Sequence, residues 1–170
     1  MIERQFLKGD AASVAQYSDC ENYRYELTRI WDDKGRKVVF VMLNPSTATE
    51  IQNDPTVERC ERRARTLGFG GSRVCNIFAY RATDPRDMRA QDDPVGAEND
   101  KAILRACAWA DRIVCAWGTH GEHLQRGPEV EAMLRAQPKA LFHLGLSKMG
   151  HPKHPLYIAY AVQPVVWDLL

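Results

Sequence analysis

The chain lacks the features that define several common classes of protein. No apolar run approaches the roughly 18 residues of a membrane span, and the first residues lack the apolar segment of a signal peptide. The formal net charge is only +1, so no global basic field indicates a tight, sequence-independent binder of nucleic acid. With 45% hydrophobic and 26% charged residues, we expect one soluble, cytoplasmic domain over 1–170.

The signatures of several enzyme classes are missing as well. The five cysteines include no C-x-x-C pair, which argues against a zinc knuckle or an iron–sulfur cluster, and we expect buried, reduced thiols. No G-x-G-x-x-G or Walker pattern opens a helix, and no serine nucleophile elbow is present. Two histidine pairs spaced three apart stand without an H-E-x-x-H motif. We therefore expect no metal and no cofactor.

The stretch 37–43 organises the predicted fold. It is a near-continuous apolar run rich in β-branched residues, which is typical of a strand buried on both faces of a parallel sheet. Pro45 cannot continue the hydrogen-bonded ladder, so Asn44 falls at the carboxyl end of this strand. The preceding segment, 23–31, alternates apolar and charged residues, which predicts a half-exposed edge strand in a hairpin with 37–43.

Strands and helices alternate along the rest of the chain. Asp54 and Pro55 are a strong start signal for a helix that ends near Gly68. We interpret its arginine-rich face as solvated. The pattern predicts further strands at 72–80, 112–117 and 139–144, further helices at 97–110 and 128–136, and a tail over 159–170 that packs on the body. This alternation favours a parallel sheet with helices on both faces.

Four polar or glycine-rich loops follow these strands, at 44–47, 80–84, 118–121 and 147–157. Because the carboxyl ends of parallel strands meet at one edge of a sheet, we expect the loops to converge on a ligand site. The last loop contains lysines and histidines but no acidic residue, a composition that suits phosphate or a departing anion.

Several blocks of sequence resemble one family. Met42–Ala48, Asn53–Thr56, Asn76–Pro85, Ala116–Gly118 and His154–Tyr157 are similar to the motif set of domain of unknown function 1643, a family of bacteria and phages. The resemblance covers about 23–157 and implies no established activity.

A more distant resemblance, to the uracil-DNA glycosylase superfamily, implies more. Its order of motifs is a strand ending in Asn-Pro-Ser, a strand with an asparagine, an apolar strand ending in Trp-Gly, and a final His-Pro loop. The resemblance implies a three-layer α/β/α fold with a short, mainly parallel four-stranded central sheet plus an N-terminal edge strand. It also implies that Asn44 positions the attacking water. The last loop would supply a histidine to the leaving base, and either His151 or His154 fits, of which we prefer His154.

The function that this resemblance implies is hydrolysis of the N-glycosidic bond of a base in nucleic acid or a nucleotide. Tyr80 or Phe78 would stack on the base. One alternative is a non-catalytic binder of nucleic acid or a modified base on the same fold, and another is a small-molecule enzyme acting on nucleotides. The candidate catalytic residues are Asn44, His151 and His154. The candidate substrate-binding residues are Pro45, Ser46, Thr47, Asn76, Tyr80, Arg81, Thr83, Asp84, Trp117, Gly118, Lys148, Lys153 and Tyr157.

Overall fold

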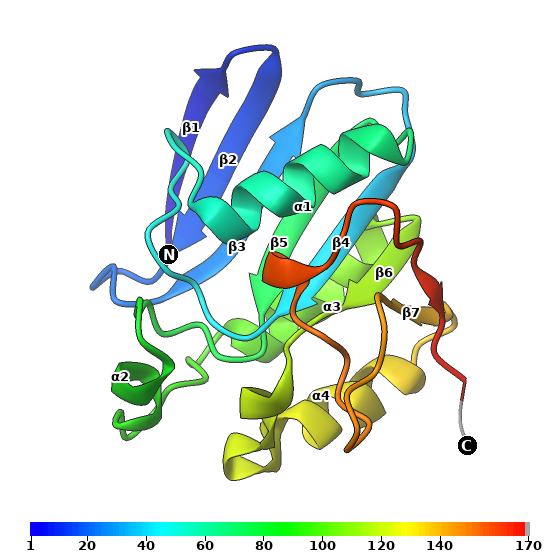
Figure 1. Ribbon diagram of the computed structural model, residues 1–170. Helices are drawn as coiled ribbons and strands as arrows, with labels where there is room; N and C mark the ends of the chain where they lie inside the picture. Colours follow the sequence, from blue (N-terminus) through cyan, green and yellow to red (C-terminus); the bar gives the residue numbers. More distant parts are fainter. Residues whose placement is uncertain (169–170) are drawn as a thin grey trace.

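The computed structural model of the protein describes residues 1–168. Its centre is a mixed sheet of eight strands in the order β1-β2-β3-β5-β4-β6-β7-β8 (Figure 1). The strands are β1 (Ile2–Lys8), β2 (Ala11–Tyr17), β3 (Arg24–Ile30), β4 (Lys37–Met42), β5 (Gly71–Asn76), β6 (Arg112–Cys115), β7 (Leu141–His143) and β8 (Val165–Val166). The helices are α1 (Pro55–Thr66), α2 (Pro85–Arg89), α3 (Asn99–Trp109), α4 (Arg126–Arg135) and the 3-10 segments η1 (Thr119–Gln125) and η2 (Pro155–Tyr157). Within 1–168, no helix is both long and apolar enough to cross a membrane.

The expected short, mainly parallel four-stranded sheet with one edge strand, like that of uracil-DNA glycosylases, is wrong. The pairs β1–β2, β2–β3, β3–β5 and β7–β8 are antiparallel, whereas β4–β5, β4–β6 and β6–β7 are parallel. Strand β2 has no clear signal in the sequence because three of its four buried side chains are small, namely Ala11, Ser13 and Ala15. The apolar–polar alternation that identifies a half-buried strand is therefore weak there.

The predicted hairpin between 23–31 and 37–43 is also wrong, because β5 lies between β3 and β4. The turn after β3 packs against the start of β5, where the backbone amides of Trp31 and Asp32 donate to the carbonyl oxygen of Gly70 at 3.0 and 2.9 Å. Two strands joined by a tight turn need not be neighbours in the sheet, because a strand from later in the chain can insert between them.

Strand β3 is almost fully buried instead of half-exposed. Its polar side chains have partners of opposite charge or hydrogen-bonding groups, as with Glu26, whose carboxylate lies 3.0 Å from Arg105 and 3.7 Å from Arg73. The alternation of charge and apolar residues in β3 therefore marks two packed faces, one of which is polar.

Strand β4 is buried on both faces, as its sequence predicts. Val39 and Val41 pack in one apolar cluster with the buried sides of α3 and α4, and Phe40 and Met42 pack in another with α1. Figure 1 shows α1 crossing one face of the sheet with α3 behind the other. All five cysteines are free thiols and four are buried, but Cys20 is exposed, contrary to expectation.

The tail returns to the sheet, as the sequence predicts, over its described part. Trp167 is buried in the cluster with α4, whereas Val165 and Val166 of β8 stay exposed. Residues 169–170 of this predicted segment lie outside the described residues.

Gly70→Ala should destabilise the protein. A Cβ atom at this position would lie 2.7 Å from the Cα atom of Gly35 and closer still to the carbonyl oxygen of Asp32. Because both obstacles are backbone, we expect the free energy of unfolding in urea to fall by about 1–3 kcal/mol. Gly9→Ala is the control, since nothing lies within 4 Å there and only a φ of 61° opposes a side chain. An unchanged urea midpoint for Gly70→Ala would contradict the close packing.

Candidate functional site

A pocket of about 500 Å³ lies at the carboxyl edge of the parallel strands. Segments that follow β4, β5, β6 and β7 all contribute to it, because these four strands are parallel neighbours. The pocket brings together seven of the candidate residues, which are Asn44, Ser46, Thr83, Trp117, Gly118, His154 and Tyr157.

Asn44 is held by its own side-chain amide. The Nδ2 group donates to the carbonyl oxygen of Ala82 at 2.7 Å and to that of Pro45 at 3.1 Å. Both donor hydrogens are thus committed to backbone, which fixes the plane of the amide. The remaining Oδ1 atom is an acceptor, and no donor within 1–168 bonds to it. Asn44 can therefore receive a hydrogen bond from a water or a ligand.

His154 presents the opposite chemistry in the same pocket. Its Nδ1 atom accepts a hydrogen bond from the backbone amide of Leu156 at 3.3 Å, so the ring proton sits on Nε2. Burial lowers the pKa of His154, an effect that His120 reinforces and that nearby Asp54 opposes. The imidazole is consequently neutral at pH 7 and can donate one hydrogen bond from Nε2.

Asp54 is a third polar group of the pocket, and the sequence indicated only its role as the helix cap. That role is confirmed, since Oδ1 accepts from the backbone amide of Val57 at 2.8 Å. Oδ2 accepts from the backbone amide of Ala48 at 3.2 Å. The position of Asp54 within the resembling block 53–56 was the available signal, because α1 follows the Asn44 loop directly. The carboxylate of Asp54 therefore lines the same pocket as Asn44 and His154.

The structure places other candidates away from the pocket. Tyr80 pairs with Tyr23, their ring centroids 5.6 Å apart, and the Arg81 guanidinium lies over the Tyr17 ring at 5.0 Å. Phe78, the other proposed stacking residue, is fully buried in the core. Asp84 caps α2 and binds Arg86, and the candidates Thr47, Lys148, His151 and Lys153 do not line the pocket.

A smaller cavity of about 30 Å³ adjoins the pocket. The two share five lining residues, which are Asn44, Ser46, Asp54, Thr56 and His154. Two further candidates, Pro45 and Asn76, line only the smaller cavity, together with the buried Arg24. Nothing in the sequence marked Arg24, because an arginine in an alternating strand is usually exposed.

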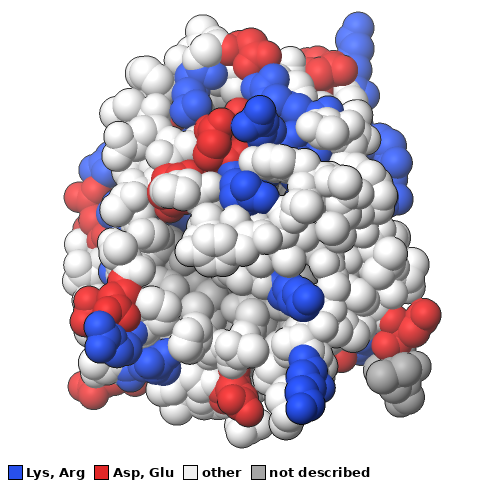
Figure 2. All heavy atoms as spheres, in the orientation of Figure 1, with Lys and Arg blue, Asp and Glu red and all other residues white. Residues whose placement is uncertain are grey.

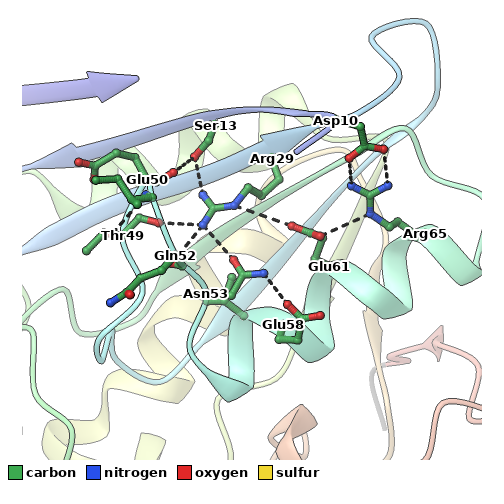
Figure 3. A network of polar contacts seen from close by, with 12 residues as sticks. Asp10, Ser13, Arg29, Thr49, Glu50, Gln52, Asn53, Glu58, Glu61 and Arg65 are labelled. Carbon is green, nitrogen blue, oxygen red and sulfur yellow. Dashed lines mark hydrogen bonds and ion pairs between the residues drawn. The ribbon is translucent and has the colours of Figure 1, made fainter. Parts of the chain in front are cut away.

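Arg29 fixes the segment that joins the Asn44 loop to Asp54 (Figure 3). Its guanidinium is fully buried and donates to the carbonyl oxygen of Thr49 at 2.7 Å and to Asn53 Oδ1 at 2.9 Å. It also donates to the hydroxyl of Ser13 at 2.7 Å, which in turn donates to the carbonyl oxygen of Glu50 at 2.6 Å. These bonds from β2 and β3 set the position of one pocket wall.

Arginines of α1 fix the opposite wall, so the expectation of a solvated arginine face is wrong in part. Arg63 is fully buried and donates to the carbonyl oxygens of Val162 at 2.8 Å and Ile158 at 2.9 Å. Arg59 lies 4.4 Å from the centroid of the Tyr160 ring and donates to the carbonyl oxygen of Pro155. Both side chains therefore bind the backbone of the segment that follows His154 and hold it against α1.

The fold and the pocket define an α/β protein with a mixed eight-stranded sheet and a pocket at the carboxyl edge of its parallel strands. A family model described as protein of unknown function (DUF1643) matches residues 24–156, and the chain belongs to that family. No curated protein and no solved structure matches the chain. The resemblance to uracil-DNA glycosylases has no support from these comparisons.

His154 should make the stability of the protein depend on pH. Its pKa in the folded state lies below the ordinary value of 6.5, so the unfolded chain binds the proton more readily. Stability is then complete above about pH 6.5 and declines as pH falls toward the folded pKa. We expect a smaller loss of melting temperature between about pH 7.5 and pH 5 in His154→Gln than in wild type. Equal losses in the two proteins would contradict a half-buried His154 with a lowered pKa.

Arg63→Met should loosen the segment 155–162 without unfolding the sheet. Three backbone carbonyls would lose the donor that Arg63 supplies, and that of Val162 would lose the one side-chain donor that bonds to it within 1–168. Amide hydrogen exchange in this segment and at His154 should therefore accelerate about tenfold or more. The matched control is Arg62→Met, because Arg62 is exposed and only borders the Tyr160 ring. Equal exchange rates in the two variants would show that Arg63 does not hold this wall.

Proposed function

We propose that the pocket binds a nucleobase and that the protein hydrolyses its N-glycosidic bond, in a nucleic acid or a nucleotide. One observation carries the proposal, namely that the acceptor Oδ1 of Asn44 and the half-buried, neutral His154 line the same pocket. Hydrolysis of this bond needs an acceptor that positions the attacking water and a donor that stabilises the base as it leaves as an anion.

The chemistry follows from the charges that develop. Breaking the bond between the sugar and the base passes through an oxocarbenium-like sugar, and the bonding electrons stay on the base. The Oδ1 atom of Asn44 would hold the attacking water, and the carboxylate of Asp54 would take its proton. The Nε2 hydrogen of His154 would donate to the departing base. A preorganised neutral donor of this kind is effective because it needs no rearrangement as the charge forms.

Two aromatic side chains of the pocket, Trp117 and Tyr157, are suited to contact the base in place of Tyr80 and Phe78. Trp117 is almost fully buried, whereas Tyr157 is 91% exposed. A base must leave its stack before it can enter such a pocket. A rigid ring at the wall and a free ring at the entrance fit that requirement.

Release of free base is the direct test. The full chain would be incubated with nucleosides, nucleotides and single- and double-stranded DNA carrying varied bases, and free base and abasic sites would be measured. We expect Asn44→Ala and His154→Gln each to lower the rate about a hundredfold or more. His143→Gln is the control, since this partly buried histidine lies outside the pocket. Saturable base binding that requires Asn44 but yields no product would instead support a non-catalytic binder.

The distribution of charge favours a small nucleotide over duplex DNA as the substrate. On the face in Figure 2, basic and acidic side chains are scattered among mostly uncharged ones, without a continuous basic band. Binding that weakens steeply with salt would indicate duplex contacts, because such contacts release counterions. A shallow salt dependence would indicate the nucleotide.

A further inference from the structure

Arg24 is a buried cation beside the pocket without a close counter-ion. It is 1% exposed, and no carboxylate within residues 1–168 lies within 4.0 Å of its guanidinium. Its hydrogen bonds run to the carbonyl oxygen of Ala48 at 2.9 Å and to Asn76 Oδ1 at 3.5 Å. Burial lowers the pKa of Arg24 to about 10, against the opposing effect of Asp54. The side chain is thus charged at pH 7 and only partly compensated.

Two donors next to the smaller cavity have no partner within the described chain. They are the Nε group of Arg24 and the Nδ2 group of Asn76, whose residue is also 1% exposed. Leaving a buried donor unpaired costs about 1–3 kcal/mol, and more for a charged group. An acceptor placed in the cavity, between these two side chains and the pocket, would recover that cost.

The size of the cavity limits what this acceptor is. A volume of about 30 Å³ accommodates one oxygen-sized group, but not a phosphate group with its four oxygens. The cavity shares Asn44, Asp54 and His154 with the pocket, so it borders the space that a ligand in the pocket would fill. The Arg24 cation favours an atom that carries negative charge, whereas the carboxylate of Asp54, which lines the same cavity, opposes it.

We propose that the smaller cavity is an oxyanion subsite, in which Arg24 and the side-chain amide of Asn76 receive one exocyclic oxygen of the bound heterocycle. The assignment rests on the proposed hydrolysis and deepens it. When the bond between sugar and base breaks, its electron pair moves onto the base and delocalises to that oxygen. The water oxygen bonds to the sugar carbon and one water proton passes to Asp54. The base anion then takes up one proton from solvent while Asp54 releases its own to solvent, so the net products are the free sugar hydroxyl and the neutral base. The ligand class is therefore a heterocycle with an acidic ring and an exocyclic oxygen.

Binding of free bases tests the subsite without requiring catalysis. Affinities of the full chain would be measured by calorimetry for uracil, 5-fluorouracil and 5-nitrouracil, and for hypoxanthine, xanthine and adenine. Ring acidity rises from uracil through 5-fluorouracil to 5-nitrouracil, and from hypoxanthine to xanthine. Adenine is a weak acid that lacks an exocyclic oxygen. We expect affinity to rise with ring acidity by about tenfold or more in at least one series, with adenine the weakest purine.

Variants then assign the effect to Arg24. Arg24→Met should weaken the most acidic ligand about ten- to a hundredfold and remove the dependence on acidity. Arg24→Lys should retain part of the dependence and serves if the methionine variant does not fold. Arg126→Met is the matched control, because Arg126 is equally buried but lines neither cavity.

The outcomes separate the subsite from the hydrolase. Four results would overturn the subsite and leave a cavity for water alone. They are an affinity that does not depend on ring acidity, an unchanged dependence in Arg24→Met, tight binding of adenine, and binding of none of the six bases. Acidity-dependent binding without release of base from any substrate would keep the subsite and reject the hydrolase. Release of base at a rate that does not depend on Arg24 would keep the hydrolase and reject the subsite.

Discussion

Buried guanidinium groups that donate to backbone carbonyls hold the loops of this protein in place. Loop carbonyls lack the regular partners of helices and strands, so each buried one needs a donor from elsewhere. Arginine suits the task because its planar fork offers several donors in fixed directions. Four fully buried arginines act in this way, by pairing Arg24 with Ala48, Arg29 with Thr49, Arg63 with Ile158 and Arg126 with Ile77.

The parallel and antiparallel parts of the sheet contribute to the pocket in different ways. The parallel strands β4 to β7 bring the ends of their loops to one edge, and the antiparallel strand β3 sends Arg24 and Arg29 beneath the loop that follows β4. The antiparallel half thus supports the wall that contains Asn44 and Asp54. A four-stranded parallel sheet alone would bring the loops together but would not supply these donors.

The sequence was informative where burial is apolar and local. Strand β4 could be predicted because a continuous apolar run is a strong pattern. The start of α1 could be predicted because an aspartate N-cap followed by proline is a strong signal as well. The convergence of the loops followed from the alternation of strands and helices. Strands β1 and β2 could not be found, because β1 has no buried side chain and three of the four buried positions of β2 are alanine or serine. Arg24 was missed for a related reason, since its burial depends on partners more than 20 residues away.

The position of β5 between β3 and β4 affects how the chain reaches its native state. During synthesis, β1, β2 and β3 leave the ribosome before β5 and can form only an isolated antiparallel meander. This meander cannot join β4 until residues 71–76 have arrived to bridge them. Pairings between strands distant in sequence form slowly because loop closure precedes the gain in contacts. The edge of β3 therefore stays open through early translation, a period in which a nascent chain is prone to pair with a neighbour.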